Sequence, residues 1–211
     1  MRARALAVLA STLAGALLVG GCVLKRSNVA RTYVLDPLAA REAPAPTPTP
    51  VATVGVEKVG VPDWLDRPQV TGRTASGEVV TDEFSRWGEP LARGVQRVVA
   101  ENLAALLPDR RVLGAPFPPR DAVDHRVRVT LVEAARQADG SVLVEARWEV
   151  LGDGGEVLSR NRSSHRAAHA AAGAAGAVAG VSEALDLLSR EIADRLRTLP
   201  QSGSALYLPK R

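Results

Sequence analysis

Two histidines four residues apart are the first candidate for chemistry in this sequence. His165 and His169 would lie on one face of a helix, where they could present two ligands to a metal ion. A metal site needs more ligands, however. His125 is the only other histidine, and no Glu or Cys stands near the pair. The pattern is more typical of two solvated histidines at a junction between a strand and a helix, so no metal site is predicted.

A serine offers the second candidate, a nucleophile. The run "GVSEA" around Ser182 is similar to a nucleophile elbow, but that motif needs a preceding strand and a sharp turn. Ser182 instead stands where a helix is expected to begin, and its side chain would cap that helix. The glycines of "GDGGE" at 152–156 fit a hairpin loop, because no helix follows them to form a phosphate site. We therefore expect no catalytic residues and no enzyme activity.

The single cysteine, Cys22, ends an apolar run near the N-terminus. Arg2 and Arg4 form a basic head, residues 5–19 are uncharged, and small residues precede the cysteine, as in a secretory signal. The run "LVGGC" resembles the lipobox of bacterial lipoproteins, whose cysteine is lipidated and becomes the mature N-terminus. The resemblance implies a signal peptide over residues 1–21 and a covalent lipid on Cys22, with no other cofactor.

A transmembrane anchor is the alternative interpretation of this run. Residues 5–24 are uncharged and have roughly the 20 residues that a membrane-spanning helix needs. They are rich in Ala, Gly, Ser and Thr, so permanent insertion would be only weakly favourable. The lipobox interpretation is preferred for this reason.

The charge pattern argues against a nucleic-acid partner. The formal net charge is +4, and removal of Arg2 and Arg4 with the signal would leave about +2. Aromatic residues make up 3% of the chain, and no dense Lys/Arg run with interleaved aromatics occurs. A single cysteine also excludes an intramolecular disulfide, so the fold must depend on its core.

The mature chain predicts one α+β (α/β-class) domain. Residues 22–31 are a polar tether, 32–199 form the domain, and 200–211 are a mobile tail. Within the domain, the Pro-rich stretch 37–50 favours an extended loop. Alternation of apolar and polar residues predicts strands, and spacings of three or four predict helices. The strands are expected at 32–36, 51–62, 68–73, 78–87, 111–116, 125–136, 142–150 and 156–167, and the helices at 90–107 and 181–199. The Ala/Gly-rich residues 167–180 would be a loose turn or a frayed helix start. The expected architecture is a mixed, mainly antiparallel sheet with both helices packed on one face.

Two segments, "VPDWLDRPQV" and "FSRWGEPL", carry the most distinctive residues. These are Trp64, Asp66, Arg67, Pro68, Arg86, Trp87 and Glu89. In a structural interpretation, which we prefer, Trp87 fills the core and the four charged residues pair to fix a corner between strand and helix. In a functional interpretation the same corner docks a partner.

These segments also carry a family resemblance. "VGVPDWLDRPQVTGR", "SRWGEPLARGVQRVVAENLAALL" and "LSREIADRL", together with "TYVLD" at 32–36, resemble the ABC-type transport auxiliary lipoproteins, including the paraquat-inducible lipoproteins of the PqiC type. The resemblance covers nearly the whole mature chain in the family's order. Trp64, where a smaller aromatic is expected, the Ala/Gly-rich stretch and the Pro-rich insert depart from the family pattern, which affects local loop geometry only.

The resemblance implies a non-catalytic component of a lipid transport system. Its partners would be an MCE-domain protein and an inner-membrane permease and ATPase, with the membrane contacted through the lipid anchor. Val23 follows the cysteine in place of the aspartate that often signals inner-membrane retention, so the periplasmic side of the outer membrane is the expected location. A homo-oligomer is compatible with this role. The alternative is a lipoprotein that itself binds a small apolar ligand between the sheet and the helices.

Overall fold

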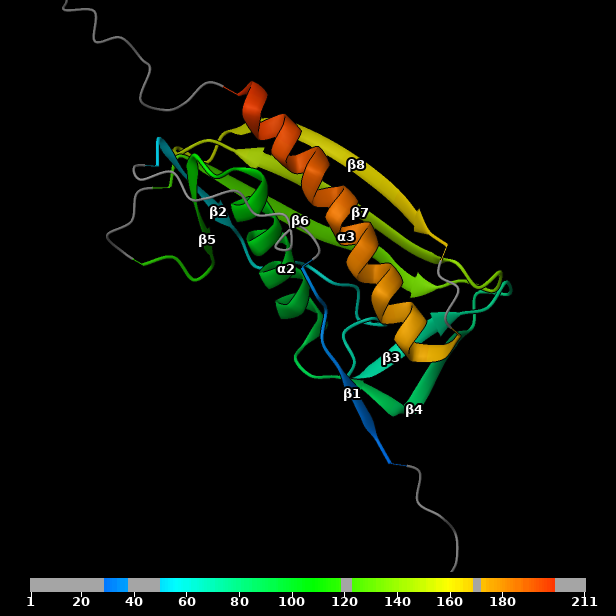
Figure 1. Ribbon diagram of the computed structural model, residues 1–211. Coiled ribbons are helices and arrows are strands. Elements are labelled where there is room, and N and C mark those ends of the chain that lie inside the picture. The colour runs from blue at the N-terminus through cyan, green and yellow to red at the C-terminus, as the bar shows by residue number, and fades with distance from the viewer. Residues whose placement is uncertain (1–28, 38–49, 119–122, 169–171, 200–211) are drawn as a thin grey trace, which may run out of the picture.

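Figure 1 shows a computed structural model of the chain, which describes residues 29–37, 50–118, 123–168 and 172–199. The described residues form eight strands and two helices. The strands are β1 (Arg31–Tyr33), β2 (Ala52–Val56), β3 (Gln69–Arg73), β4 (Val79–Trp87), β5 (Arg110–Gly114), β6 (His125–Arg136), β7 (Val142–Leu151) and β8 (Val157–Ala167). The helices are α2 (Leu91–Leu106) and α3 (Gly173–Thr198).

Three long antiparallel strands, β6, β7 and β8, form one side of the sheet, with β8 at its edge. In β6, Val127, Val129 and Leu131 are buried on one face, while Arg128 and Thr130 are exposed on the other, as the alternation predicts. Tight loops join these strands, and the loops contain Gly140 and Gly155 at φ values of 86° and 85°, which favour glycine. The predicted three-stranded meander is confirmed.

The edge of β6 that faces away from β7 pairs with two smaller groups of strands. The start of β6 pairs in parallel with β2, which pairs with β5, and the end of β6 pairs with β3, which leads to β4 and β1. Between the two groups, Gly60 forms a single bridge to Thr130. Figure 1 accordingly places β5 at one end of the molecule and β4 at the other. The sheet is mixed and mainly antiparallel, as predicted.

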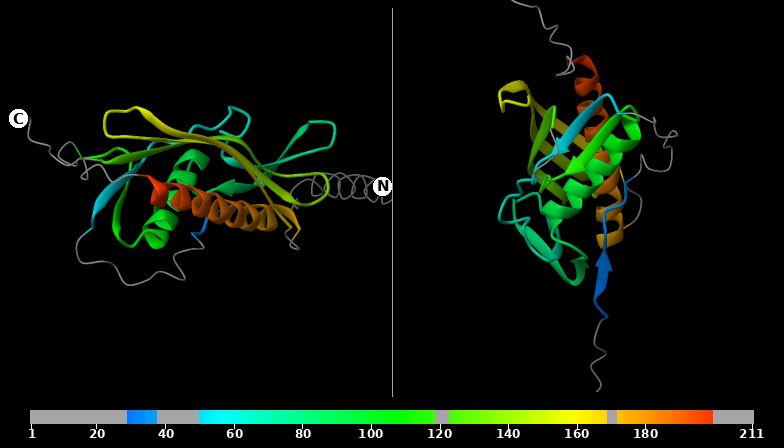
Figure 2. Two further views of the ribbon diagram at one scale, coloured as in Figure 1. Left: turned by 90° about the horizontal axis from the view of Figure 1, so that it is seen from above. Right: turned by 90° about the vertical axis from the view of Figure 1, so that its left-hand side faces the viewer.

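Both helices cover the same face of the sheet, as Figure 2 shows in its left view. The predicted helix at 90–107 is confirmed as α2, whose residues Val95, Val98 and Leu103 are fully buried. The apolar stripe of α3, represented by Leu185 and Ile192, is fully buried as well. The predicted α+β fold with two helices on one face is therefore confirmed.

The second helix begins earlier than the sequence pattern indicates. We predicted a start near residue 181, but α3 begins at Gly173, so the Ala/Gly-rich segment forms its first turns. Alanine has the highest helix propensity, which favours this extension. Gly180 allows the helix to approach β7 closely, since a Cβ atom there would lie 2.5 Å from Cγ2 of Val142. Of the two alternatives for this stretch, the helix start is confirmed for residues 173–180 and the loose turn is wrong there.

Two arginines bind carbonyl groups at the C-terminal ends of the two helices. Arg110, at the start of β5, donates a hydrogen bond of 2.9 Å to the carbonyl of Leu196 in α3. Arg197, in α3, donates one of 2.6 Å to the carbonyl of Leu106 in α2. A cation near a helix C-terminus interacts favourably with the helix dipole. Each helix end is thus capped by a residue from another element, which fixes the two helices side by side.

Candidate functional site

A tight reversal of the chain between β2 and β3 forms the first half of the predicted corner. The carbonyl of Pro62 accepts hydrogen bonds from the backbone N–H groups of Leu65 and Asp66, at 2.9 and 3.1 Å. Leu65 is 1% exposed, so it anchors the reversal in the core. Asp66, Arg67 and Pro68 follow on the surface.

The end of β4 forms the second half of the corner and is bonded directly to the first. The backbone N–H of Trp87 donates a hydrogen bond of 2.7 Å to the carbonyl of Pro68. Residues 66–68 and 87–90 together line a surface hollow of about 320 Å³, a volume within the range of small-molecule sites. The structure therefore brings together Asp66, Arg67, Pro68, Trp87 and Glu89 of the predicted set. Trp64 and Arg86 do not line the hollow. We call this feature the corner hollow.

The structural interpretation of the corner is wrong in its prediction that Trp87 fills the core. Trp87 is partly buried at the corner hollow and only borders the core. The core tryptophan is Trp148 on β7, which is 3% exposed and donates a hydrogen bond of 2.8 Å from Nε1 to Ser163 Oγ. The sequence contains a signal for this placement, because Trp148 lies an even number of positions from Val144 and Val150 and therefore on the same buried face of the strand. Trp87 is left at the surface because β4 ends there.

The predicted pairing of the corner charges is wrong as well. Glu89 forms an ion pair of 2.7 Å with Arg97 of α2, and not with Arg67 or Arg86. Arg97 also donates a hydrogen bond of 2.8 Å to the carbonyl of Leu35. The hydrogen bonds that Arg97 donates to the Glu89 carboxylate are the main reason that the pKa of Arg97 is raised. Among the described residues, no ion pair joins Asp66, Arg67 or Arg86 to another side chain, so these charges remain available at the surface.

Strand β1 lies directly beside the corner hollow. It pairs in parallel with β4, with Tyr33 opposite Trp87, and the N–H of Gly88 donates a hydrogen bond of 2.7 Å to the carbonyl of Tyr33. A Cβ atom on Gly88 would lie 3.0 Å from Cγ2 of Val34, so a larger residue would require that side chain to shift by a few tenths of an ångström. Leu35 then enters the core with 2% exposure. The segment that follows the predicted tether is therefore part of the folded domain.

Trp64 belongs to a separate contact on the same end of the sheet. The guanidinium of Arg73 lies 6.0 Å from the ring centre of Trp64 and forms an ion pair of 2.9 Å with Glu133. Burial raises the pKa of the Glu133 carboxyl above its usual range, and the bond from Arg73 opposes this shift. Trp64 therefore supports a charged pair on β3 and β6 and does not shape the corner hollow.

The residues considered for catalysis do not form a site. Ser182 lies inside α3 and accepts a hydrogen bond of 3.1 Å from the backbone N–H of Asp36, so its predicted role as a helix cap is wrong. A helix interior also lacks the strand and sharp turn of a nucleophile elbow. His165 on β8 lies 3.4 Å from Glu191, and His169 lies outside the described residues. No group of three or more metal-ligating side chains occurs in the part of the chain that the structure describes.

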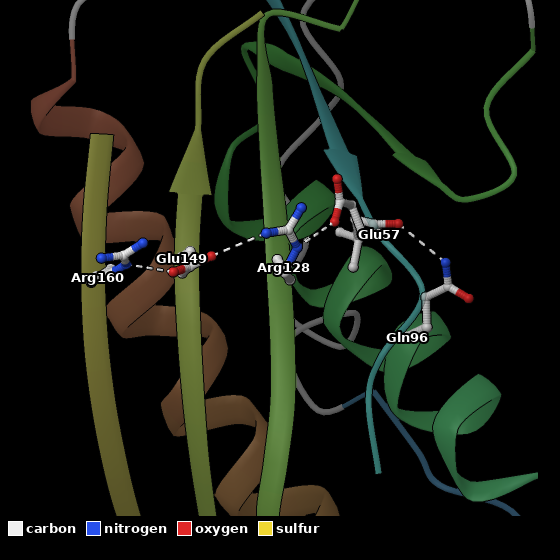
Figure 3. Close-up of polar contacts among 6 residues, drawn as sticks. Glu57, Gln96, Arg128, Glu149 and Arg160 are labelled. Carbon is white, nitrogen blue, oxygen red and sulfur yellow. Dashed lines mark hydrogen bonds and ion pairs between the residues drawn. The ribbon is translucent and has the colours of Figure 1, made fainter. Parts of the chain in front are cut away.

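The outer face of the sheet, opposite the helices, carries a row of alternating charges that the sequence analysis missed. Figure 3 shows Glu57, which follows β2, in a line with Arg128 on β6, Glu149 on β7 and Arg160 on β8, with successive separations of 2.8, 3.2 and 2.6 Å. The pKa of Glu149 is lowered, chiefly by its hydrogen bond from Arg160. Figure 3 also shows Gln96 of α2, which donates a bond of 3.1 Å to the carbonyl of Val56. The charged residues recur at every second position, which is the signal that could have revealed this face.

The predicted lipid attachment residue, Cys22, lies outside the described residues, as does the uncharged run at 5–24. Over the ranges that the structure does describe, neither helix has the length and apolar character required to cross a membrane.

Comparisons with known proteins match most of the folded chain. The sequence model of one protein family, described as "ABC-type transport auxiliary lipoprotein component", matches residues 33–193, from β1 into α3. No curated protein matches the sequence.

Solved structures share the fold at low sequence identity. The crystal structure of an uncharacterised protein is similar with a TM-score of 0.66 and 21% identity, over 80% of this chain and 99% of that one. A protein from Xanthomonas campestris, assigned to the family DUF330, is similar with a TM-score of 0.61 and 15% identity, over 79% of this chain and 94% of that one. At these identities the likeness shows the fold alone.

Proposed function

The chain belongs to the family of ABC-type transport auxiliary lipoprotein components, and from this premise we propose that it is a docking module of the PqiC type. In this role it joins an MCE-domain protein, and through it an inner-membrane permease and ATPase, to a membrane. The family is of a non-catalytic kind and implies membrane anchoring. The docking role and the partners are our proposal.

The observation that carries the proposal is the position of the corner hollow beside the strand that follows the anchor. Trp87 and Arg67 both line the hollow; Trp87 is partly exposed, and Arg67 is exposed with no ion pair to another described residue. Tryptophan and arginine are the residue types that contribute most often to binding hot spots. Because Tyr33 of β1 pairs with Trp87, a partner in the hollow would sit directly on the anchored end of the domain.

We propose Cys22 as the lipidated residue and the periplasmic side of the outer membrane as the location. The tether from Val23 to Arg31 spans about 30 Å when fully extended, so β1 stays close to the membrane. A single acyl chain would bind only reversibly, whereas the several chains of a lipoprotein give stable anchoring. Domain boundaries at 22–31 for the tether and 32–199 for the domain follow from the same proposal.

The alternative function, direct binding of an apolar ligand between the sheet and the helices, has less support. Helix α3 packs onto β7 at the closest approach that Gly180 allows to Val142. The two helices also contact each other, and Asn102 of α2 donates a hydrogen bond of 3.3 Å to Ser189 of α3. A ligand in this layer would have to separate elements that are in direct contact.

The test is recovery of the MCE-domain protein with the full-length chain from native membranes. Arg67→Glu should reduce the recovery about tenfold or more, as expected for a hot-spot residue. Arg93→Glu is the matched control, because it makes the same charge change at an exposed site on α2 that does not line the hollow. Equal recovery with both variants would contradict docking at the corner hollow, and no recovery with the wild type would contradict the partner.

Lipidation is measured separately by the intact mass of the membrane-extracted protein. A lipid increment that disappears in Cys22→Ala is expected. Lipidation without recovery of the MCE-domain protein would leave the anchor in place and favour direct ligand binding. Absence of a lipid would contradict the lipobox interpretation, whatever the outcome for the partner.

A further inference from the structure

The outer face of the sheet holds a hollow with a volume of about 520 Å³. Both helices pack on the opposite face of the sheet (Figure 2), so neither helix covers this hollow. Side chains from β6, β7 and β8 line it. The charged members are Arg128, Arg147, Arg160, Arg162 and Glu149. We call this feature the outer arginine surface.

The charges of the outer arginine surface do not balance. Its lining contains four arginines and one glutamate. Glu57 and Glu145, just outside the lining, pair with Arg128 and Arg162, so one positive charge remains in excess. One row across the strands is well paired, because Glu149 lies between Arg128 and Arg160 at 3.2 and 2.6 Å. The excess therefore has to come from elsewhere in the lining.

The neighbouring row supplies the excess. Arg147 on β7 lies directly opposite Arg162 on β8 and Thr130 on β6. Arg162 reaches Glu145 at 2.5 Å, whereas the guanidinium of Arg147 makes no ion pair with any other of the described residues. Like charges directly opposite each other on a sheet are destabilising. Arg147 therefore carries a repulsion that no acidic side chain in the described part of the chain offsets, although glutamates pair with the arginines in the adjacent rows of the sheet.

We propose that the outer arginine surface binds the phosphate groups of anionic phospholipids at a membrane surface. Guanidinium groups suit this role, since their planar fork matches phosphate oxygens in a bidentate manner. The family's membrane anchoring holds the surface close to lipid headgroups, which raises their local concentration. The proposal rests on that anchoring and is independent of the partner at the corner hollow. An acidic protein segment is the competing occupant, and the test distinguishes it.

The test measures how anionic lipid protects the arginines from chemical modification. The full chain is extracted from membranes and reconstituted into vesicles of phosphatidylcholine alone or of phosphatidylcholine with phosphatidylglycerol. Phenylglyoxal then modifies exposed arginines, and mass spectrometry reports the rate at each site. With phosphatidylglycerol, Arg147 and Arg162 should react about tenfold more slowly, as for a ligand at about nine times its dissociation constant. Arg93, exposed on the helix side, should react at the same rate in both vesicles.

A variant and two soluble competitors complete the test. Arg147→Gln should weaken the protection of Arg162 about fivefold, the loss expected for one basic residue at an anionic membrane, whereas Arg93→Gln should not change it. Equal rates in the two kinds of vesicle would overturn the proposal. Protection by inorganic phosphate alone would indicate a site for small anions. Protection by polyglutamate but not by phosphatidylglycerol would indicate that the natural ligand is an acidic protein segment. Either result would overturn the lipid assignment while leaving the recovery of the MCE-domain protein unaffected.

Discussion

Replacement of Gly180 by alanine gives the sharpest test of how α3 sits on the sheet. In an unobstructed helix this change stabilises the protein by about 1 kcal/mol, because glycine has the lower helix propensity. At Gly180, however, the new Cβ atom would lie 2.5 Å from Cγ2 and 2.7 Å from Cβ of Val142. Val142 is fully buried in β7 and cannot turn away. Overpacking of a core typically costs about 1–3 kcal/mol, so we expect a net destabilisation of up to about 2 kcal/mol.

Gly94 of α2 provides the matched control, since it is also a buried glycine inside a helix. A Cβ atom there would lie 3.3 Å from Oε1 of Glu89 and 3.5 Å from Cδ1 of Leu35. These atoms end flexible side chains and can move by a few tenths of an ångström. Gly94→Ala should therefore be neutral or stabilising by up to about 1 kcal/mol.

Unfolding in urea, followed by the fluorescence of the three tryptophans, measures both variants. Val142→Ala should cost about 2 kcal/mol on its own, from lost burial and a small cavity. Because it also removes the atoms that obstruct residue 180, the double variant should be more stable than the sum of the single changes predicts. If Gly180→Ala stabilised the protein as much as Gly94→Ala does, or if the double variant were additive, the close contact between α3 and β7 would be refuted.

Four further predictions concern the anchored strand, a buried acid and the location of the protein. Leu35→Ala should lower the free energy of unfolding by about 2–5 kcal/mol, because Leu35 is 2% exposed, and urea unfolding checks this. Proteolytic cleavage within residues 38–49 should leave the domain on the membrane until denaturant is added, since β1 is paired with β4; soluble release would contradict this. Burial raises the pKa of Glu133 in the folded protein above the ordinary 4.5. Between the pKa of the unfolded chain and the higher pKa of the folded protein, the folded protein keeps a proton that the unfolded chain has released. The free energy of unfolding therefore falls as the pH rises through this interval. Thermal unfolding from pH 4 upward should show Glu133→Gln gaining stability relative to the wild type as the pH rises, whereas a constant difference would contradict the shift. Val23→Asp should move the protein from the outer to the inner membrane in a fractionation experiment.

The parts of the fold that the sequence predicts well are those governed by local repetition. The alternation in β6 and the spacing of Val95 and Leu103 in α2 arise because each element buries one face. The order of apolar and polar residues along each element therefore shows which face is buried. The start of α3 could not be predicted in this way. A glycine ordinarily weakens a helix, and only the position of Val142 in a distant strand explains why Gly180 belongs inside one. Ser182 was misplaced for the same reason, since its partner, the N–H of Asp36, comes from the other end of the domain.

The corner shows which aspect of a site remains hidden in the sequence. The two distinctive segments could be identified and expected to meet, and residues 66–68 and 87–90 do line one hollow. The partners of their charges could not be predicted, because Glu89 pairs with Arg97 in the second turn of α2. The outer arginine surface was missed because an arginine at every second position is also what an ordinary solvated strand face shows. Only the pairing register, which sets Arg147 opposite Arg162, reveals the unbalanced charge.

Strand β1 and the residues after it are held in part by the same elements that form the corner hollow. Three elements hold the segment that follows the tether: β4 pairs with Tyr33, Arg97 of α2 binds the carbonyl of Leu35, and Ser182 of α3 accepts the N–H of Asp36. Since Arg97 also holds Glu89 at the corner hollow, a displacement of β1 would disturb the hollow directly. Residues 31–36 therefore move with the folded domain and with the corner hollow. The proposed docking site is built on the same residues that hold β1, so a partner bound at the hollow would be held at a fixed orientation to β1.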